Sequence, residues 1–147
     1  MKPKKLITWA IVAFLGYQLF GYVKEHTSPQ VIAYKRFANA VMNGNLAIAE
    51  DRAVEGYARQ VMASQAAREE LFDGYDVVFT YYEVKSISVD PSGTSATVHA
   101  EQVTRVNPEH ESVLWGKEAI RIRHSVRLVK DKDVWLVTNF TDPGSDR

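Results

Sequence analysis

The chain has 147 residues, of which 46% are hydrophobic and 24% charged, a composition typical of one folded domain with its own core. Its 18 basic and 18 acidic residues balance, but Lys2, Lys4 and Lys5 are three of the basic ones, so residues 24–147 carry 15 basic against 18 acidic groups. This mildly acidic part has no bulk attraction for nucleic acid. The lack of cysteine excludes a disulfide framework, a thiolate metal site and a cysteine nucleophile.

Residues 1–26 begin with basic side chains and continue as an uncharged segment over residues 6–23. As a helix this segment is roughly 27 Å long, close to the ~30 Å of a hydrocarbon core, and Trp9, Tyr17 and Tyr22 near its ends are typical of the membrane interface. No small-x-small cleavage site follows it, so an uncleaved signal anchor is predicted, with the N-terminus in the cytoplasm. A cleaved signal peptide, which would leave a secreted domain, stays open as the alternative.

Three helices are expected between residues 28 and 73. Ser28 and Pro29 are typical of a helix N-terminus, and Gly44 is typical of the residue after a helix. Asn45 is expected to cap a second, short helix that runs to about residue 54, and a third helix is expected over residues 57–73. The buried side of the first helix is predicted to consist of Val31, Tyr34, Ala38 and Val41.

From residue 76 onward the sequence alternates with the period of two that β-strands have. Four strands are predicted, at residues 76–90, 94–106, 117–130 and 134–141, and a phase change at residues 83–85 predicts a bulge in the first. The fold class is therefore α+β: three N-terminal helices packed on a bent, cone-like meander of four antiparallel strands, preceded by one transmembrane helix. Residues 27–147 are expected to form a single domain outside the cytoplasm.

One position breaks the alternation of the third strand, because residue 124 should be apolar and is a histidine. His124 is either a working group in a pocket, where a neutral imidazole exchanges protons with a ligand, or a core histidine bonded to one of four neighbours. These four possible partners are Tyr34, Tyr81, Tyr82 and Gln102. The second interpretation is favoured, since no second titratable group accompanies it. The predicted inner row otherwise consists of Ile120, Ile122, Val126 and Leu128 on this strand, and Ala96, Val98, Ala100 and Gln102 on the strand before it.

The opening helix "VIAYKRFANAVMNGN", the order of three helices before a long-stranded meander, and the last strand "DVWLVTNFTD" resemble the nuclear transport factor two-like superfamily, which includes ketosteroid isomerases and SnoaL-like cyclases. The resemblance covers about residues 28–142 and implies a cone that encloses a pocket. It carries over no catalytic residue, because the pattern assigns no Asp or Glu to the inner faces. Glu83, at the phase change in the first strand, is the single candidate, and its facing stays open. A single anchor ahead of such a domain also resembles the periplasmic assembly subunit of type IV secretion systems.

The remaining candidates each have two interpretations. Trp115 is either a lid or anchor for a partner, or a plug for the end of the barrel. The His and carboxylates of residues 108–111 are not expected to form a metal site. The candidates for a pocket are Tyr34, Tyr81, Tyr82, Gln102 and His124, of which the tyrosines alternatively pack in the core. A stripe on the outer face either binds an acidic partner or is solvated and paired with Glu101, and it consists of Arg105, Arg121, Arg123 and Arg127.

These features predict an accessory or assembly subunit of an envelope complex, held by a single span in the cell inner membrane with its domain in the periplasm. Other membrane or periplasmic proteins, or a second copy of the chain, are the expected partners, and no nucleic acid, metal or cofactor is expected. Because no catalytic constellation is evident, this role is favoured over an enzyme. The alternative is a small-molecule-binding or isomerase- or dehydratase-like protein that uses a pocket around His124.

Overall fold

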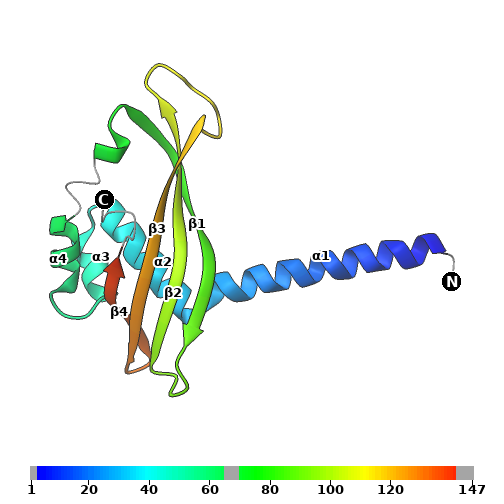
Figure 1. The fold of residues 1–147 in the computed structure, drawn as a ribbon, viewed down its shortest axis with the longest axis horizontal. Helices are drawn as coiled ribbons and strands as arrows, with labels where there is room; N and C mark the ends of the chain where they lie inside the picture. Colours follow the sequence, from blue (N-terminus) through cyan, green and yellow to red (C-terminus); the bar gives the residue numbers. More distant parts are fainter. Residues whose placement is uncertain (1–2, 65–69, 142–147) are drawn as a thin grey trace.

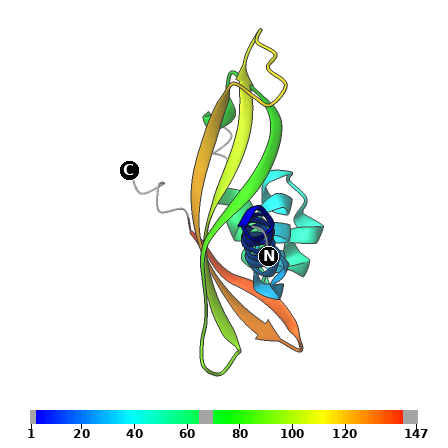
Figure 2. The same ribbon diagram turned by 90° about the vertical axis from the view of Figure 1, so that its right-hand side faces the viewer.

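The computed structural model of the chain describes residues 3–64 and 70–141, and its four strands form one antiparallel sheet in the order β1-β2-β3-β4. Helices α2 to α4 pack on one face of this sheet (Figures 1 and 2). The predicted α+β class and the four-strand meander are therefore confirmed. The elements are α1 (Pro3–Thr27), α2 (Pro29–Met42), α3 (Leu46–Asp51), α4 (Tyr57–Ser64), the 3-10 turn η1 (Glu70–Phe72), β1 (Tyr75–Val89), β2 (Ser95–Pro108), β3 (Glu118–Asp131) and β4 (Val134–Thr141).

The local signals at the helix ends act as the sequence predicts. The Val31 amide donates to Ser28 Oγ at the start of α2, and the Ile48 amide donates to Asn45 Oδ1 at the start of α3. Gly44 between these helices has a φ of 68°, a left-handed conformation that favours glycine. The third predicted helix is α4 as far as Ser64, and its expected continuation through residues 65–69 lies outside the described residues.

Helix α1 runs away from the body of the molecule as a single rod (Figure 1). Its large apolar side chains between Leu6 and Phe20 are exposed by 55–74%. Within the described parts of the chain, no helix has the combined length and apolar character required to cross a membrane, so the predicted transmembrane helix over residues 6–23 finds no support in the structure.

The sheet bends where the sequence changes phase. The pairing of β1 with β2 shifts between Val84 and Ser86, as predicted, and a second shift between Val77 and Phe79 was not predicted. The inner rows of β2 and β3 are buried apart from Ile120, which is half-buried, and this confirms the predicted faces. Val103 is an exception, because it lies on the outer face beside Tyr81 and is nevertheless fully buried.

Candidate functional site

A pocket of about 300 Å³ lies between the C-terminal end of α2 and the inner face of the sheet. Its walls are mostly apolar, and the buried polar side chains among them are Gln102 on β2 and His124 on β3. This volume is at the lower end of the range for small-molecule sites. The apolar walls are formed by Ala38, Val41, Met42, Phe72, Val77, Ile122 and Phe140, and Asn43 also lines the pocket.

His124 is held by the helix that covers the sheet. It is 3% exposed, and its Nδ1 lies 2.7 Å from Oη of Tyr34, a fully buried residue of α2. The ring of Phe140 on β4 packs against the imidazole with 4.4 Å between centroids. Tyr34 is one of the four partners that the sequence suggested for this histidine, and the contact fixes the imidazole on the wall of the pocket.

Burial makes the two inner tyrosines hydrogen-bond donors rather than acids. Burial away from water is the main cause that raises the pKa of Tyr34 far above its usual value, and the proximity of Tyr82 is a second, smaller cause. The Tyr34 phenol therefore keeps its proton and can donate it in a hydrogen bond to an unprotonated Nδ1 of His124. Burial likewise raises the pKa of Tyr82, whose hydroxyl donates to Asn39 Oδ1 at 2.8 Å. The two rings meet edge to face with centroids 5.6 Å apart, which rigidifies this side of the pocket.

Gln102 is a buried polar side chain of the pocket that has a weak hydrogen-bond partner. It is 5% exposed, and the acceptor that the described residues offer to its amide nitrogen is Sδ of Met42, at 3.3 Å. A thioether is a weak acceptor, and Met42 Sδ also lies 3.6 Å from the hydroxyl of Thr80. The Gln102 amide therefore gains free energy from a better acceptor placed in the pocket.

The structure brings three of the five predicted pocket residues together and separates the others. Gln102 and His124 line the pocket, and Tyr34 lies directly behind His124. Tyr82 is on the inner face but bonds to α2 outside the lining. Tyr81 pairs with Val103 on the outer face, so it does not reach the pocket.

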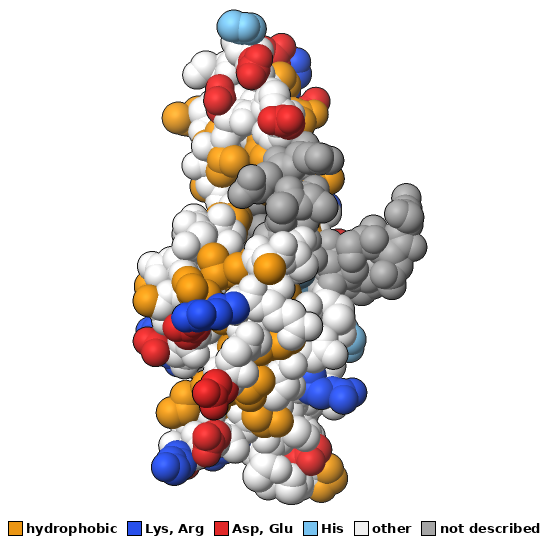
Figure 3. Space-filling view, turned by 90° about the vertical axis from the view of Figure 1, so that its left-hand side faces the viewer, with side chains coloured by type: hydrophobic (Ala, Val, Ile, Leu, Met, Phe, Trp, Pro, Cys, Tyr) orange, Lys and Arg blue, Asp and Glu red, His pale blue; other side chains and the backbone are white. Residues whose placement is uncertain are grey.

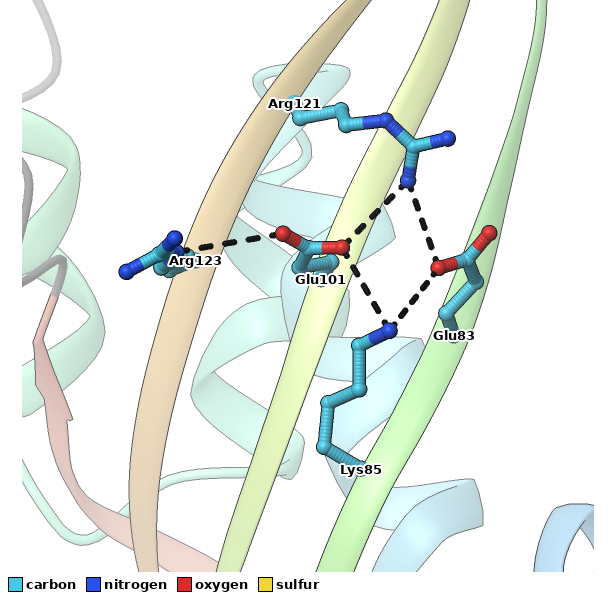
Figure 4. A network of polar contacts seen from close by, with 5 residues as sticks. All are labelled: Glu83, Lys85, Glu101, Arg121 and Arg123. Carbon is cyan, nitrogen blue, oxygen red and sulfur yellow. Dashed lines mark hydrogen bonds and ion pairs between the residues drawn. The ribbon is translucent and has the colours of Figure 1, made fainter.

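Two arginines of the outer stripe, Arg121 and Arg123, are paired with acidic side chains (Figure 4). Glu101 on β2 lies 3.3 Å from Arg121 and 3.9 Å from Arg123, and Lys85 joins Glu101 to Glu83. The hydrogen bond from Lys85, with the Arg121 charge, holds the pKa of Glu83 below its usual value. This arrangement matches the predicted pairing with Glu101 and leaves little uncompensated positive charge at the centre of the stripe.

Arg105 and Trp115, the other outer candidates, meet near the tip of the β2–β3 connection. The Arg105 guanidinium donates to the Trp115 carbonyl, while the Trp115 side chain is 63% exposed. Trp115 therefore does not plug the end of the sheet. Arg127 lies opposite Asn139 in the pairing of β3 with β4, away from this tip.

Sequence reasoning missed Met42, Asn43 and Phe140 as lining residues. Met42 and Asn43 are the last residue and the C-cap of α2, and a periodic pattern does not show that a pocket opens beside this helix end. Phe140 belongs to a strand with apolar residues on both faces, so no alternation of apolar and polar residues indicated which face Phe140 lies on. The one available signal for these lining residues was the polar Gln102 in an apolar inner row, which indicates a pocket beside it.

Comparison with protein families and with curated proteins finds no match for this chain. Similar solved structures include an NTF-2-like protein of unknown function from Shewanella oneidensis MR-1, with 14% identity, coverage of 78% of this chain and 95% of that one, and a TM-score of 0.49. A proposed ketosteroid isomerase from Shewanella frigidimarina has 14% identity, coverage of 78% and 94%, and a TM-score of 0.44. The intermembrane space region of the chloroplast protein ARC6 has 16% identity, coverage of 77% and 86%, and a TM-score of 0.35. Likenesses at this level do not assign the chain to a family.

Proposed function

We propose that the domain binds a small, mostly apolar molecule that carries a hydrogen-bond acceptor such as a carbonyl group. The observation that carries this proposal is the buried amide of Gln102, which lies on the pocket wall and has a sulfur atom as its acceptor among the described residues. A ligand carbonyl that replaces Met42 Sδ turns a weak hydrogen bond into an ordinary one. Such a bond contributes about 0.5–1.5 kcal/mol to binding.

The pocket favours a compact ligand over a long one. A volume of about 300 Å³ with apolar walls from α2 and the sheet suits a single ring or a short branched chain. The His124 imidazole, held by Tyr34, forms a second polar point on the wall and orients the ligand. Met42 is 37% exposed at the end of α2, and its flexible side chain can move aside to admit the ligand.

The test is a comparison of cyclohexanone with methylenecyclohexane, which has nearly the same shape and no acceptor, in titrations followed by NMR. We expect the ketone to bind about 2–10-fold more tightly to the full chain, in proportion to the free energy of one hydrogen bond. The Gln102→Leu variant should bind both probes with equal affinity. Saturable shifts are expected at Val41 and Ile122 in the lining.

The matched control is Thr104→Val, a buried substitution on the same face of β2 at a residue that does not line the pocket. This variant should keep the preference for the ketone. Equal affinity of the unmodified chain for the two probes, or shifts that do not saturate, would overturn the proposal.

A second candidate function is the accessory subunit predicted from the sequence, held at the cell inner membrane through residues 6–23 with the domain in the periplasm. Although no described helix meets the length and apolar character of a membrane span, α1 exposes large apolar side chains and begins with Lys4 and Lys5, and these two features favour this role. The test is carbonate extraction of membranes from cells that make the full chain, with Phe14→Asp as the matched variant. The unmodified chain should stay with the membranes and the variant should be released, whereas release of both would exclude this role.

A further inference from the structure

The connection between β2 and β3 presents two large apolar side chains to solvent. Leu114 is 88% exposed, the highest value for a large apolar residue in the described ranges, and the neighbouring Trp115 is 63% exposed. This connection lies at the far end of the long strands (Figure 1), and neither residue lines the pocket. Adjacent exposed leucine and tryptophan side chains are costly for solubility and typical of binding sites.

The side chain of Asn107, which is buried, holds the backbone on both sides of these two residues through hydrogen bonds. Its amide nitrogen donates to the Val113 carbonyl at 3.0 Å, and its Oδ1 accepts from the amides of Val113 at 3.3 Å and Lys117 at 3.0 Å. One buried side chain therefore closes both ends of the segment that carries Leu114 and Trp115.

Arg105 holds the same segment from the side. Its guanidinium donates to the carbonyls of Trp115 at 3.1 Å and Gly116 at 2.7 Å. Gly116 has a φ of 80°, and a Cβ at this position would lie 2.9 Å from Arg105 Cβ and from the Val106 nitrogen. The segment is thus ordered before any partner arrives, which lowers the entropic cost of binding.

Acidic side chains gather at this end of the molecule on the face seen in Figure 3. Glu111 forms an ion pair with Lys117 at 2.9 Å, and the Glu109 amide donates to the Gly74 carbonyl, which joins the tip to the start of β1. The remaining carboxylates at this end are exposed and belong to Asp73, Asp76, Glu109 and Glu118. A negative surround repels the anionic headgroups of a lipid surface and attracts basic side chains.

We propose that the Leu114–Trp115 tip is a docking site for a different protein, whose surface has an apolar pocket bordered by Lys and Arg side chains. The indole of Trp115 enters that pocket, and the surrounding carboxylates face its basic border. Because Asn107 and Arg105 order the tip in advance, binding needs no rearrangement of this chain. This site is independent of the pocket near His124.

The test places a photo-crosslinking phenylalanine derivative at position 115, in place of Trp115, in the full chain within the source cells. The control carries the same derivative at Val134, an exposed position at the start of β4. The protein crosslinked from position 115 and not from position 134 is then purified and titrated with the unmodified chain. We expect Trp115→Ala to weaken this binding by at least about 30-fold and Val134→Ala to leave it unchanged. Affinity should also fall as salt rises from about 50 to 200 mM.

Three outcomes would overturn the proposal. The first is a crosslink to lipid or to a second copy of this chain, and the second is no crosslink above the control. The third is a purified partner whose affinity is unaffected by Trp115→Ala or by salt. Because Trp115 is exposed, loss of binding with an unchanged melting temperature separates a lost contact from a lost fold.

Discussion

Replacing Tyr34 with Phe removes a single hydroxyl from the contact that holds His124 on the pocket wall. The hydroxyl lies 2.7 Å from Nδ1 in a fully buried setting, and the rest of the ring keeps its packing against Tyr82 and Phe140. Loss of one partner from a buried hydrogen bond costs about 1–3 kcal/mol, because the remaining group stays desolvated. For a domain of this size we expect the melting temperature to fall by about 4–12 °C.

The assay is equilibrium unfolding in urea, with Tyr81→Phe as the matched control. Tyr81 carries the same hydroxyl on the outer face of the sheet and is 37% exposed, so its replacement should change the free energy of unfolding by less than about 0.5 kcal/mol. Adding His124→Leu to both variants completes a double-mutant cycle, and Tyr34→Phe should then cost less than it does alone. Equal effects of Tyr34→Phe and Tyr81→Phe would refute the role given to this contact.

Three further predictions concern pH, backbone and charge. Burial raises the pKa of Tyr34 and Tyr82, so both stay protonated when the tyrosines of the unfolded chain ionise near pH 10. Above that pH the free energy of unfolding should fall by about 1.4 kcal/mol per pH unit for each of the two residues. The absorbance of the native chain should then show two tyrosines that ionise only when urea is added. Gly116→Ala should lower the melting temperature more than Gly93→Ala, because an added Cβ meets atoms within 4 Å at Gly116 but not at Gly93. Equal decreases in the melting temperature of the two variants would contradict this reasoning. Glu101→Gln should lower the free energy of unfolding by less than about 1 kcal/mol, and by still less in 0.5 M salt. A decrease that salt leaves unchanged would argue against the ion network.

The sequence carried most of the information on the fold. The caps at Ser28 and Asn45 and the change of period at residue 76 placed the helix starts and the strands, because these are local signals. The alternation in β3 also placed His124 on the inner face. These patterns depend on residues close together in the chain, and they predicted correctly the features that such residues determine.

Contacts between elements could be predicted only in part. Four partners were open for His124, and the choice of Tyr34 depends on how α2 crosses the sheet, which no local pattern specifies. Tyr81 and Tyr82 are adjacent in the chain, and the registers at the two bulges of β1 decide that Tyr82 faces inward and Tyr81 outward. The lining by Met42 could not be foreseen, because it depends on where α2 ends relative to Gln102.

The side-chain amide of Gln102 gives the most direct test of ligand binding in the pocket. Its two N–H resonances are assigned by their loss in Gln102→Leu and followed by NMR while cyclohexanone is added to the full chain. If the ketone takes the place of Met42 Sδ as acceptor, one resonance should move downfield and saturate with the same dissociation constant as the Ile122 methyl groups. Resonances that stay in place while the Ile122 methyl groups respond, or no saturable response at either, would contradict the proposed binding site.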